Sequence, residues 1–315
     1  MTSDTDLMSR PIPHEHASHM HAVPDAPRQD DTVVLSIVMP AYNEARTIRS
    51  AVDHVLGTSY PCEIELVVVD DGSHDGTADL LDDITDERLT VTRHVRNMGK
   101  GAAVLTGISV ARGTHLMPFD ADMEYSAHDV AALVQPVIDG RTDVVYGTRL
   151  FGQNTVYRSY RYKFGNRAMT FAANVLFDSA ISDLHTCLKL VPLPMLRSME
   201  LTELGFGLDT EITANVLRLG ERPFEVPISY HSRSHADGKK INWRDAVRCI
   251  QVLGRVRMAP DNQATANAVQ ERASRAASAP RFERKAQSLR GGGSMPVAVA
   301  VSRSGEAAGA SRAAE

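Results

Sequence analysis

The sequence has few cysteines, a single tryptophan and no long run of apolar residues. Its three cysteines, Cys62, Cys187 and Cys249, lie far apart and form no Cys-x-x-Cys pair, which argues against a disulfide framework or a cysteine zinc site. Apolar runs reach only about eight residues, whereas a membrane-spanning helix needs about twenty. Residues 1–16 lack the apolar segment of a secretory signal. We therefore expect a cytoplasmic chain in a reducing compartment, with no spanning helix.

An excess of charge of one sign is also absent. Lys and Arg total 34 against 39 for Asp and Glu, a formal net charge of −5. Such a balance gives no basic field for nucleic acid, and no nucleic-acid partner is expected. No GxGxxG follows the first predicted strand, and no GxxxxGK[ST] occurs anywhere. These absences disfavour a dinucleotide-dependent dehydrogenase and a P-loop NTPase.

Two segments of low apolar content flank a central region. Residues 1–31 hold four prolines and a histidine cluster, which is either a metal-binding tract or a solvated tail. Residues 259–315 are rich in Ala, Ser, Gly and Arg. Neither segment can bury enough apolar surface to offset the entropy lost on ordering. We predict disordered tails over 1–31 and 259–315 and a single catalytic domain over 32–258.

Strand and helix patterns alternate through the central region. The predicted strands are 33–39, 64–69, 89–92, 115–119 and 144–146. The predicted helices are 45–56, 77–84, 101–112, 127–138 and 211–219. Ser126 and Asp129 resemble a capping box at the start of the fourth. This order predicts an α/β fold with a mostly parallel sheet and helices on both faces.

Polar residues follow three of these strands: Tyr42-Asn43-Glu44, Asp70-Asp71 and Asp120-Ala121-Asp122. Ligands of such sheets bind at the carboxyl ends of strands, where neighbouring carboxylates repel unless a cation intervenes. Oxygen ligands suit Mg²⁺ or Mn²⁺, so Asp120 and Asp122 are candidate metal ligands, with plain turn formation as the alternative. Lys100, between two glycines at a helix start, is a candidate phosphate contact or part of a plain turn.

Five motifs in this order carry a resemblance to a known family: PAYNE (40–44), DDGSHDGT (70–77), NMGKGAA (97–103), DAD (120–122) and GTR (147–149). The sequence resembles a family-2 glycosyltransferase of the GT-A fold. It is most similar to the branch of dolichol-phosphate mannosyltransferases and related polyprenyl-phosphate sugar transferases. The resemblance covers about residues 32–245 and continues in the blocks 183–189, 205–211, 225–228 and 233–240.

The resemblance implies a nucleotide-diphosphate sugar donor, a UDP- or GDP-sugar, with Mg²⁺ or Mn²⁺ as cofactor. It implies that the nucleoside and the rest of the donor contact Pro40, Tyr42, Glu44, Val69, Asp71, Lys100, Asp120 and Ala121. Asp120 and Asp122 would hold the metal ion. Glu124 stands where the branch often has Gln, and would add a third metal ligand.

The resemblance also implies roles for three cations. Arg149 would face the acceptor or the diphosphate, and Arg233 and Lys240 would close over phosphates. For the two arginines a surface ion pair is the alternative. A phosphate acceptor is already anionic and needs only such cations. A sugar hydroxyl needs a carboxylate base, for which Asp209 and Glu211 are the candidates, with helix N-terminal charge as the alternative.

The function expected is inverting sugar transfer, in which Asp122, Arg149 and either Asp209 or Glu211 act at the reacting atoms. The expected acceptor is a polyprenyl phosphate or another cell-envelope acceptor. The alternatives are a soluble sugar or glycan hydroxyl, and an inactive sugar-nucleotide-binding scaffold. A sugar-phosphate nucleotidyltransferase is disfavoured, because PAYNE stands where its Gly-rich signature should be.

Two stretches, Tyr157–Phe177 and Trp243–Met258, mix basic with aromatic or aliphatic residues. Basic amphipathic helices of this kind lie on anionic membrane surfaces. The alternative is a pair of helices packed on the sheet with their arginines in solvent. The first possibility predicts a peripheral contact with the inner face of the membrane.

Overall fold

The computed structural model describes residues 32–150, 155–156, 160–231 and 243–260. The two tails predicted to be disordered, 1–31 and 259–315, lie outside the described residues except for Ala259 and Pro260.

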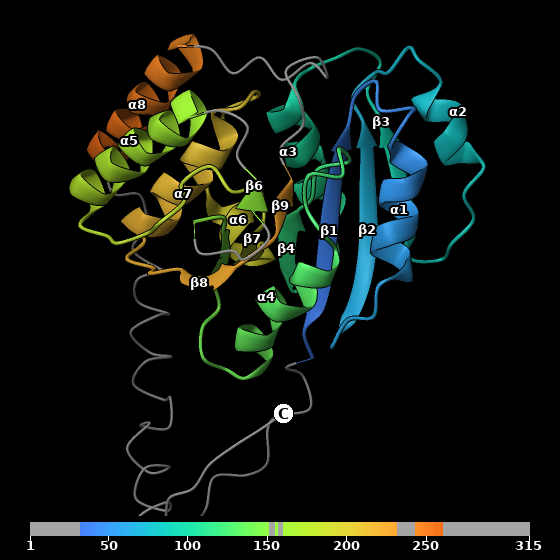
Figure 1. Ribbon diagram of the computed structural model, residues 1–315, viewed down its shortest axis with the longest axis horizontal. Coiled ribbons are helices and arrows are strands. Elements are labelled where there is room, and N and C mark those ends of the chain that lie inside the picture. Colours follow the sequence, from blue (N-terminus) through green and yellow to red (C-terminus); the bar gives the residue numbers. More distant parts are fainter. Residues whose placement is uncertain (1–31, 151–154, 157–159, 232–242, 261–315) are drawn as a thin grey trace, which may run out of the picture. The chain divides into compact units, whose positions relative to one another are not determined.

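Seven strands form one mixed sheet in the order β3-β2-β1-β4-β7-β5-β8 (Figure 1). Their bounds are β1 Val34–Ala41, β2 Glu63–Asp70, β3 Leu89–Arg93, β4 His115–Pro118, β5 Val145–Thr148, β7 Lys189–Pro192 and β8 Phe224–Pro227. Strands β1 to β4 are mutually parallel, β7 is antiparallel to both β4 and β5, and β8 is parallel to β5. A second sheet pairs β6 (Thr155–Val156) with β9 (Tyr230–His231).

The predicted α/β class with a mostly parallel sheet is confirmed, and the five predicted strands correspond to β1 to β5. The antiparallel β7 and the strand β8 were not predicted. Strand β7 has only four residues and begins with Lys189, so its sequence lacks the apolar run that marks a buried strand.

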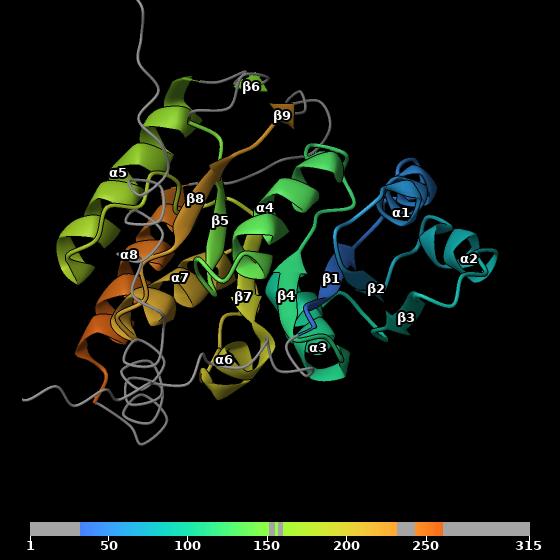
Figure 2. The same cartoon turned by 90° about the horizontal axis from the view of Figure 1, so that it is seen from below.

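Helices cover both faces of the sheet, as predicted (Figure 2). One face packs against α1 (Ile48–Gly57), α2 (Thr77–Asp82) and α4 (His128–Ile138). The other packs against α3 (Lys100–Val110), α6 (Leu193–Ser198) and α7 (Leu208–Arg218). Helices α5 (Tyr160–Phe177) and α8 (Trp243–Met258) pack on α7 and form a further layer.

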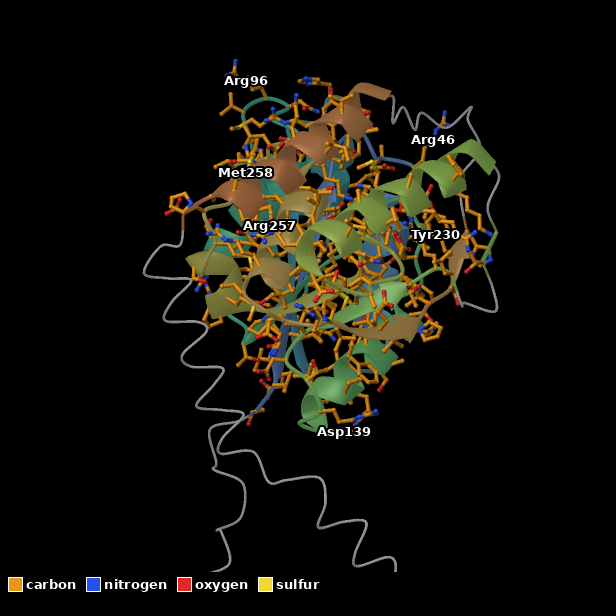
Figure 3. The ribbon with its side chains drawn as sticks, turned by 90° about the vertical axis from the view of Figure 1, so that its left-hand side faces the viewer. Arg46, Arg96, Asp139, Tyr230, Arg257 and Met258 are labelled. Atoms are coloured by element: carbon orange, nitrogen blue, oxygen red, sulfur yellow. The ribbon has the colours of Figure 1, made fainter. Side chains whose placement is uncertain are left out.

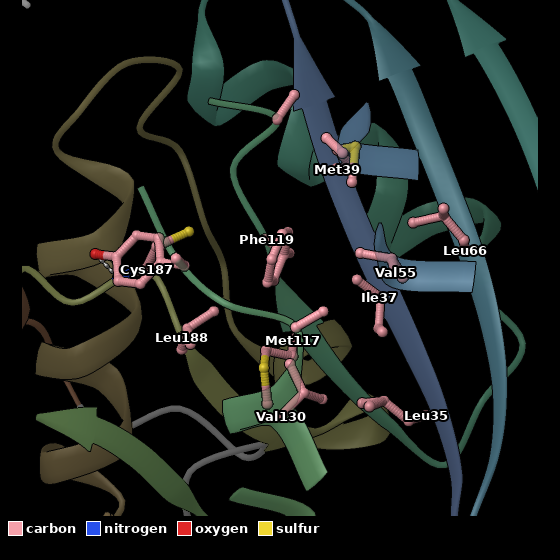
Figure 4. Packing of buried hydrophobic residues seen from close by; sticks show 14 of the residues in the cluster. Leu35, Ile37, Met39, Val55, Leu66, Met117, Phe119, Val130, Cys187 and Leu188 are labelled. Carbon is pink, nitrogen blue, oxygen red and sulfur yellow. Dashed lines mark hydrogen bonds between the residues drawn. The ribbon is translucent and has the colours of Figure 1, made fainter. Parts of the chain in front are cut away.

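The first of these faces shows how the alternation of side chains along a strand builds the core. Leu35, Ile37 and Met39 alternate along β1 and point to the same face, where they meet Met117 and Phe119 (Figure 4). All five side chains are 0% exposed. Full burial of each contributes about 1.5–3 kcal/mol, so this face fixes the register that sets the strand ends.

Only one half of the capping box predicted at the start of α4 forms: the Ser126 hydroxyl oxygen accepts a hydrogen bond from the His128 N–H at 3.3 Å. The Asp129 carboxylate instead accepts a hydrogen bond from the Ser229 N–H at 2.8 Å, which ties α4 to the segment between β8 and β9. The Ala127 N–H at the helix start donates to His54 Nε2 at 2.9 Å. Partners distant in the sequence therefore supplement the local hydrogen bond to Ser126.

The close approach of α3 to β1 allows a test of the packing. A Cβ atom at Gly107 would overlap Val38 of β1, whereas one at Gly165 of α5 would meet no atom within 4 Å. Gly107→Ala should lower the free energy of unfolding by about 1–3 kcal/mol through overpacking. The control, Gly165→Ala, should be neutral or stabilising by up to ~1 kcal/mol. Urea denaturation of the two variants measures both; equal stabilities would contradict this packing.

Candidate active site

Three parallel strands bring the predicted donor site together at one edge of the sheet. In the register of the strands, Pro40 lies beside Val69 and Val38 lies beside Pro118. The segments that follow β1, β2 and β4 therefore emerge side by side. Tyr42 and Glu44, Asp71, and Asp120 to Asp122 lie on these segments, as the sequence predicts.

Asp71 is a buried anchor at the end of β2. Its Oδ1 accepts hydrogen bonds from the Met98 N–H and from His94 Nδ1, and its Oδ2 accepts one from the Gly99 N–H at 2.8 Å. The carboxylate thus holds the loop that leads into α3. Val69, two residues before it, is 0% exposed, whereas Tyr42, which follows β1, is 42% exposed. The Glu44 carboxylate accepts a hydrogen bond from the Thr47 hydroxyl at 2.7 Å.

Lys100, the first residue of α3, points at the predicted metal ligands. Its Nζ lies 2.7 Å from Asp120 Oδ1 and 4.0 Å from Asp209 Oδ2. Burial alone would lower the pKa of the Lys100 ammonium, but the Asp120 carboxylate and its neighbours raise that pKa well above its usual value. Gly99 before it has φ +101°, and a side chain there would strike the Leu204 carbonyl. The backbone thus approaches closely where the helix begins.

The turn after Asp120 carries the other two predicted metal ligands, Asp122 and Glu124. Met123 has φ +59°, a strained conformation for a residue with a side chain. Asp122 Oδ1 accepts the Glu124 N–H at 3.1 Å. Glu124 is 1% exposed, and its Oε2 accepts a hydrogen bond from the Tyr230 hydroxyl at 2.7 Å. Glu124 therefore does not join Asp120 and Asp122 as expected, and the described residues hold no group of three such ligands.

The two candidate bases lie in different surroundings. Asp209 is at the site, with its Oδ1 3.6 Å from the Nζ of Lys189, a residue of β7 that is 1% exposed. Glu211 is 2% exposed, and its carboxylate accepts hydrogen bonds from Thr202 and the Glu203 N–H and pairs with Arg255 of α8 at 2.8 Å. These contacts hold the loop before α7, so the structure does not bring Glu211 to the site as expected.

Arg149 forms a buried ion pair rather than the surface pair weighed above. Its Nε and Nη2 donate to the two oxygens of Asp183 at 2.6 and 2.8 Å. Its Cζ lies 4.9 Å from the centre of the Tyr230 ring. Although burial alone would raise the pKa of Asp183, Arg149 lowers that pKa to about 2. The other two predicted cations, Arg233 and Lys240, lie outside the described residues.

Four residues of the site region were not assigned roles from the sequence: Asn166, His185, Lys189 and Tyr230. Their side chains meet Asp183, Asn166, Asp209 and Glu124 respectively. Each contact joins residues between 17 and 106 positions apart, so no local pattern marks it. The one sequence signal is the block Asp183–Lys189, which continues the family resemblance and contains His185 and Lys189.

Helices α5 and α8 match the two predicted amphipathic stretches and lie side by side (Figure 3). Large apolar side chains are exposed along both: Phe164, Phe171 and Val175 on α5, and Val247, Ile250 and Met258 on α8. We call this set the apolar face. No helix in the described ranges has the length and hydropathy needed to cross a bilayer.

Comparison with known proteins identifies the family. The model of the family described as glycosyl transferase family 2 matches residues 36–197, more than half of the chain. The chain therefore belongs to glycosyl transferase family 2, as the motifs predict.

Several curated proteins are similar to the chain. Glycosyltransferase AglD of Haloferax volcanii is 27% identical over 64% of this chain and 34% of its own length. An undecaprenyl-phosphate 4-deoxy-4-formamido-L-arabinose transferase of Aeromonas hydrophila is 29% identical over 46% of each. A UDP-N-acetylglucosamine–dolichyl-phosphate N-acetylglucosaminyltransferase of Methanococcus voltae is 23% identical over 71% and 98%. The chain thus spans less than half of the first two relatives.

Among solved structures, the fold resembles glucosyl-3-phosphoglycerate synthase of Mycobacterium tuberculosis, solved with Mn²⁺, UDP and phosphoglyceric acid. The TM-score is 0.56 at 21% identity, over 73% of this chain and 80% of that one. The GT-A-type fold predicted from the motifs is confirmed.

Burial of His185 sets an expected pH dependence. Burial and the Lys189 charge lower the pKa of His185 to about 4, although Asp209 and Asp183 oppose them and Arg149 adds to them. The fold therefore binds the neutral ring, and this part of the stability is complete above about pH 6.5, the unfolded value. The contribution of His185 to the free energy of unfolding is lost as the pH falls toward 4. The loss is at most about 1.4 kcal/mol per pH unit.

His185→Asn should remove this part of the pH dependence of the unfolding free energy. The exposed His74 gives the control, because His74→Gln should leave the profile of the parent unchanged. Urea denaturation between pH 7 and 4 measures all three proteins. The same acid slope in His185→Asn as in the parent would rule out the buried neutral ring.

Proposed function

We propose that the protein is an inverting, divalent-metal-dependent glycosyltransferase that moves a sugar from a UDP- or GDP-sugar to a polyprenyl phosphate. The observation that carries this proposal is the meeting of Asp71, Asp120 and Lys100 at the carboxyl edge of three parallel strands. The names of two relatives, an undecaprenyl-phosphate and a dolichyl-phosphate transferase, support the acceptor. The UDP and Mn²⁺ in a structural relative support the donor and the ion.

The donor is proposed to lie along the edge from Tyr42 to Lys100. Pro40, Val69 and the buried Asp71 form the floor of the nucleoside pocket, and the exposed Tyr42 ring covers it. Glu44 lies on the same segment. The diphosphate then reaches the start of α3, where backbone N–H groups and Lys100 favour an anion.

The residues at the edge fit a divalent cation. The Lys100 ammonium lies within 3.0 Å of both Asp120 oxygens, which shows that this carboxylate attracts positive charge. Asp120 and Asp122 are the proposed ligands, and their oxygens suit Mg²⁺ or Mn²⁺. When bound, the ion neutralises the charge that develops on the leaving diphosphate. Ala121, which is 2% exposed, spaces the two carboxylates.

The surroundings of Asp209 and Glu211 favour a phosphate acceptor over a hydroxyl. A hydroxyl must give its proton to a positioned carboxylate. The Glu211 oxygens are bound to Thr202, Glu203 and Arg255, and those of Asp209 lie within 4.0 Å of two lysines. An ionised phosphate needs no base. Its oxygen forms the bond to the anomeric carbon as the bond to the diphosphate breaks, and the nucleoside diphosphate leaves with that electron pair.

The direct test is release of nucleoside diphosphate from UDP- and GDP-sugars with Mn²⁺ or Mg²⁺, with and without a polyprenyl phosphate. Release that depends on the polyprenyl phosphate supports the proposal. Release that depends instead on a soluble sugar or phosphoglyceric acid would refute the lipid acceptor. It would indicate transfer to a soluble hydroxyl group, with Asp209 as the base. Binding of donor without release under any condition would indicate a sugar-nucleotide-binding scaffold.

The proposed metal ligands allow a matched comparison. Asp120→Asn and Asp122→Asn should each lower kcat/KM by about 100-fold or more, because each weakens the stabilisation of the leaving diphosphate. Asp53→Asn, an exposed change on α1, is the control and should leave kcat/KM unchanged. Chelation of divalent ions should abolish nucleoside diphosphate release by the parent protein. Normal turnover in either site variant with an intact fold, or in excess chelator, would refute the metal assignment.

The apolar face is proposed to rest on the membrane that holds the lipid acceptor. Phe171 is 70% exposed and Met258 is 80% exposed. The sequence of α5 has no acidic residue and that of α8 has one, Asp245, while both carry several basic residues. Such a surface combines apolar area with attraction to anionic lipid.

Removal of exposed apolar side chains should weaken this contact. Phe171→Ser with Ile250→Ser should lower the partition coefficient onto anionic liposomes about 100-fold or more, because each of the two buried side chains contributes about 1.5–3 kcal/mol. Ile138→Ser on α4, also an exposed apolar residue, should have no effect. Binding by the parent should weaken as salt rises. Failure of the parent to float at low salt would exclude this contact.

A further inference from the structure

The ion pair between Arg149 and Asp183 is part of a longer buried chain of hydrogen bonds. Asp183 is 0% exposed and accepts four hydrogen bonds, three from Arg149 and one from the Asn166 Nδ2 at 2.8 Å. Asn166 belongs to α5. Its Oδ1 lies 2.9 Å from His185 Nδ1, and His185 Nε2 lies 3.3 Å from the Thr210 hydroxyl of α7.

The charge of Asp183 fixes the direction of the hydrogen bonds from Arg149 through Asn166 to His185. An ionised carboxylate can only accept, so the Asn166 NH₂ must face it. The Asn166 carbonyl oxygen then faces His185, so His185 Nδ1 must carry the proton. His185 Nε2 is left as an acceptor, with the Thr210 hydroxyl at 3.3 Å and the Cys249 thiol at 3.5 Å as its neighbours. The pKa of about 2 for Asp183 and of about 4 for His185 agree with the ionised and the neutral forms that this order needs.

The chain determines which edge of Arg149 is left for a ligand. Asp183 occupies Nε and Nη2, and the Tyr230 ring lies against the face of the guanidinium. Nη1 makes no hydrogen bond to any residue that the structure describes. Held by one edge and one face, the guanidinium has a single orientation. Arg149 is 9% exposed, so only a small part of its guanidinium can reach a ligand. The chain of hydrogen bonds sets the direction in which that part points.

We propose that Asn166 and His185 are positioning residues, which act through Asp183 to orient Arg149 toward the phosphate of the acceptor. This inference rests on the proposed function for the identity of the anion. Loss of the Asn166 amide would let the Asp183 carboxylate rotate, and Arg149 would rotate with it. The result would be weaker binding of a phosphate, with little change in binding of the donor.

Asn174 offers a matched control on the same helix. It lies eight residues after Asn166 and, like Asn166, makes partly buried hydrogen bonds, with Ile181 and Ser179. It does not contact Asp183, Arg149 or His185 in the described structure. Asn166→Ala and Asn174→Ala should therefore both lower the free energy of unfolding. Only Asn166→Ala should change the orientation of the Arg149 guanidinium.

The experiment has two readouts in the full chain. NMR of the arginine Nε–H groups, assigned with Arg149→Lys, reports whether the Nε–H of Arg149 is protected from exchange. Calorimetry with a short-chain isoprenyl phosphate reports the dissociation constant for a phosphate. Asn166→Ala should abolish the protection and raise the dissociation constant about ten-fold or more, as expected for a misplaced binding group. Asn174→Ala should change neither.

His185 gives a second route should Asn166→Ala fail to fold. His185→Leu removes the Nδ1 donor and should weaken phosphate binding, whereas His185→Asn keeps an N–H toward Asn166 and should restore it. Unchanged Nε–H protection in both Asn166→Ala and His185→Leu would overturn the positioning role. Lost protection in a protein that binds no isoprenyl phosphate would support the orientation of Arg149 and count against the proposed acceptor alone.

Discussion

Compensation of negative charge is the constraint on which the site depends. The parallel strands direct several carboxylates to one edge of the sheet, and the helices around that edge add more. Three of the acidic groups there are paired with a cation: Asp120 with Lys100, Asp209 with Lys189, and Asp183 with Arg149. Without these partners the carboxylates would repel each other across a poorly solvated space. The positions of the basic residues therefore follow from those of the acids.

The cations differ in how strongly they are fixed. Arg149 and Lys189 are buried, at 9% and 1% exposure, and their partners Asp183 and Asp209 are 0% and 17% exposed. The Lys100 side chain is 23% exposed and holds an Asp120 that is 19% exposed. A partly exposed ion pair can exchange partners at a lower free-energy cost than a buried one, because water solvates the charges when the pair separates. Under the proposed function, Asp120 and Lys100 are the pair that must do so, since the donor and its ion need both.

The sequence predicts the half of the fold built from local patterns. Strands β1 and β2 are long and apolar, and the predicted strand ends put Asp71 after β2 and Asp120 after β4, where the structure has them. The sequence does not predict features that depend on contacts between residues far apart in the chain. Strand β7 is defined by antiparallel pairing with β4 and β5 rather than by its four residues. Glu124 and Glu211 belong to motifs that resemble site residues, yet Tyr230 and Arg255, 106 and 44 positions away, hold their side chains elsewhere.

Helix α5 links the two parts of the proposed acceptor site. Its inward side supplies Asn166, which binds the partner of Arg149, and its outward side supplies Phe164 and Phe171 to the apolar face. The two sides of a helix are separated by about 10–12 Å with side chains included. A lipid phosphate has the same division, with a charged end and an apolar chain. Under the proposed function, one helix therefore meets both ends of the acceptor. Contact of the outer face of α5 with lipid would then affect the position of Asn166, and through it the orientation of Arg149.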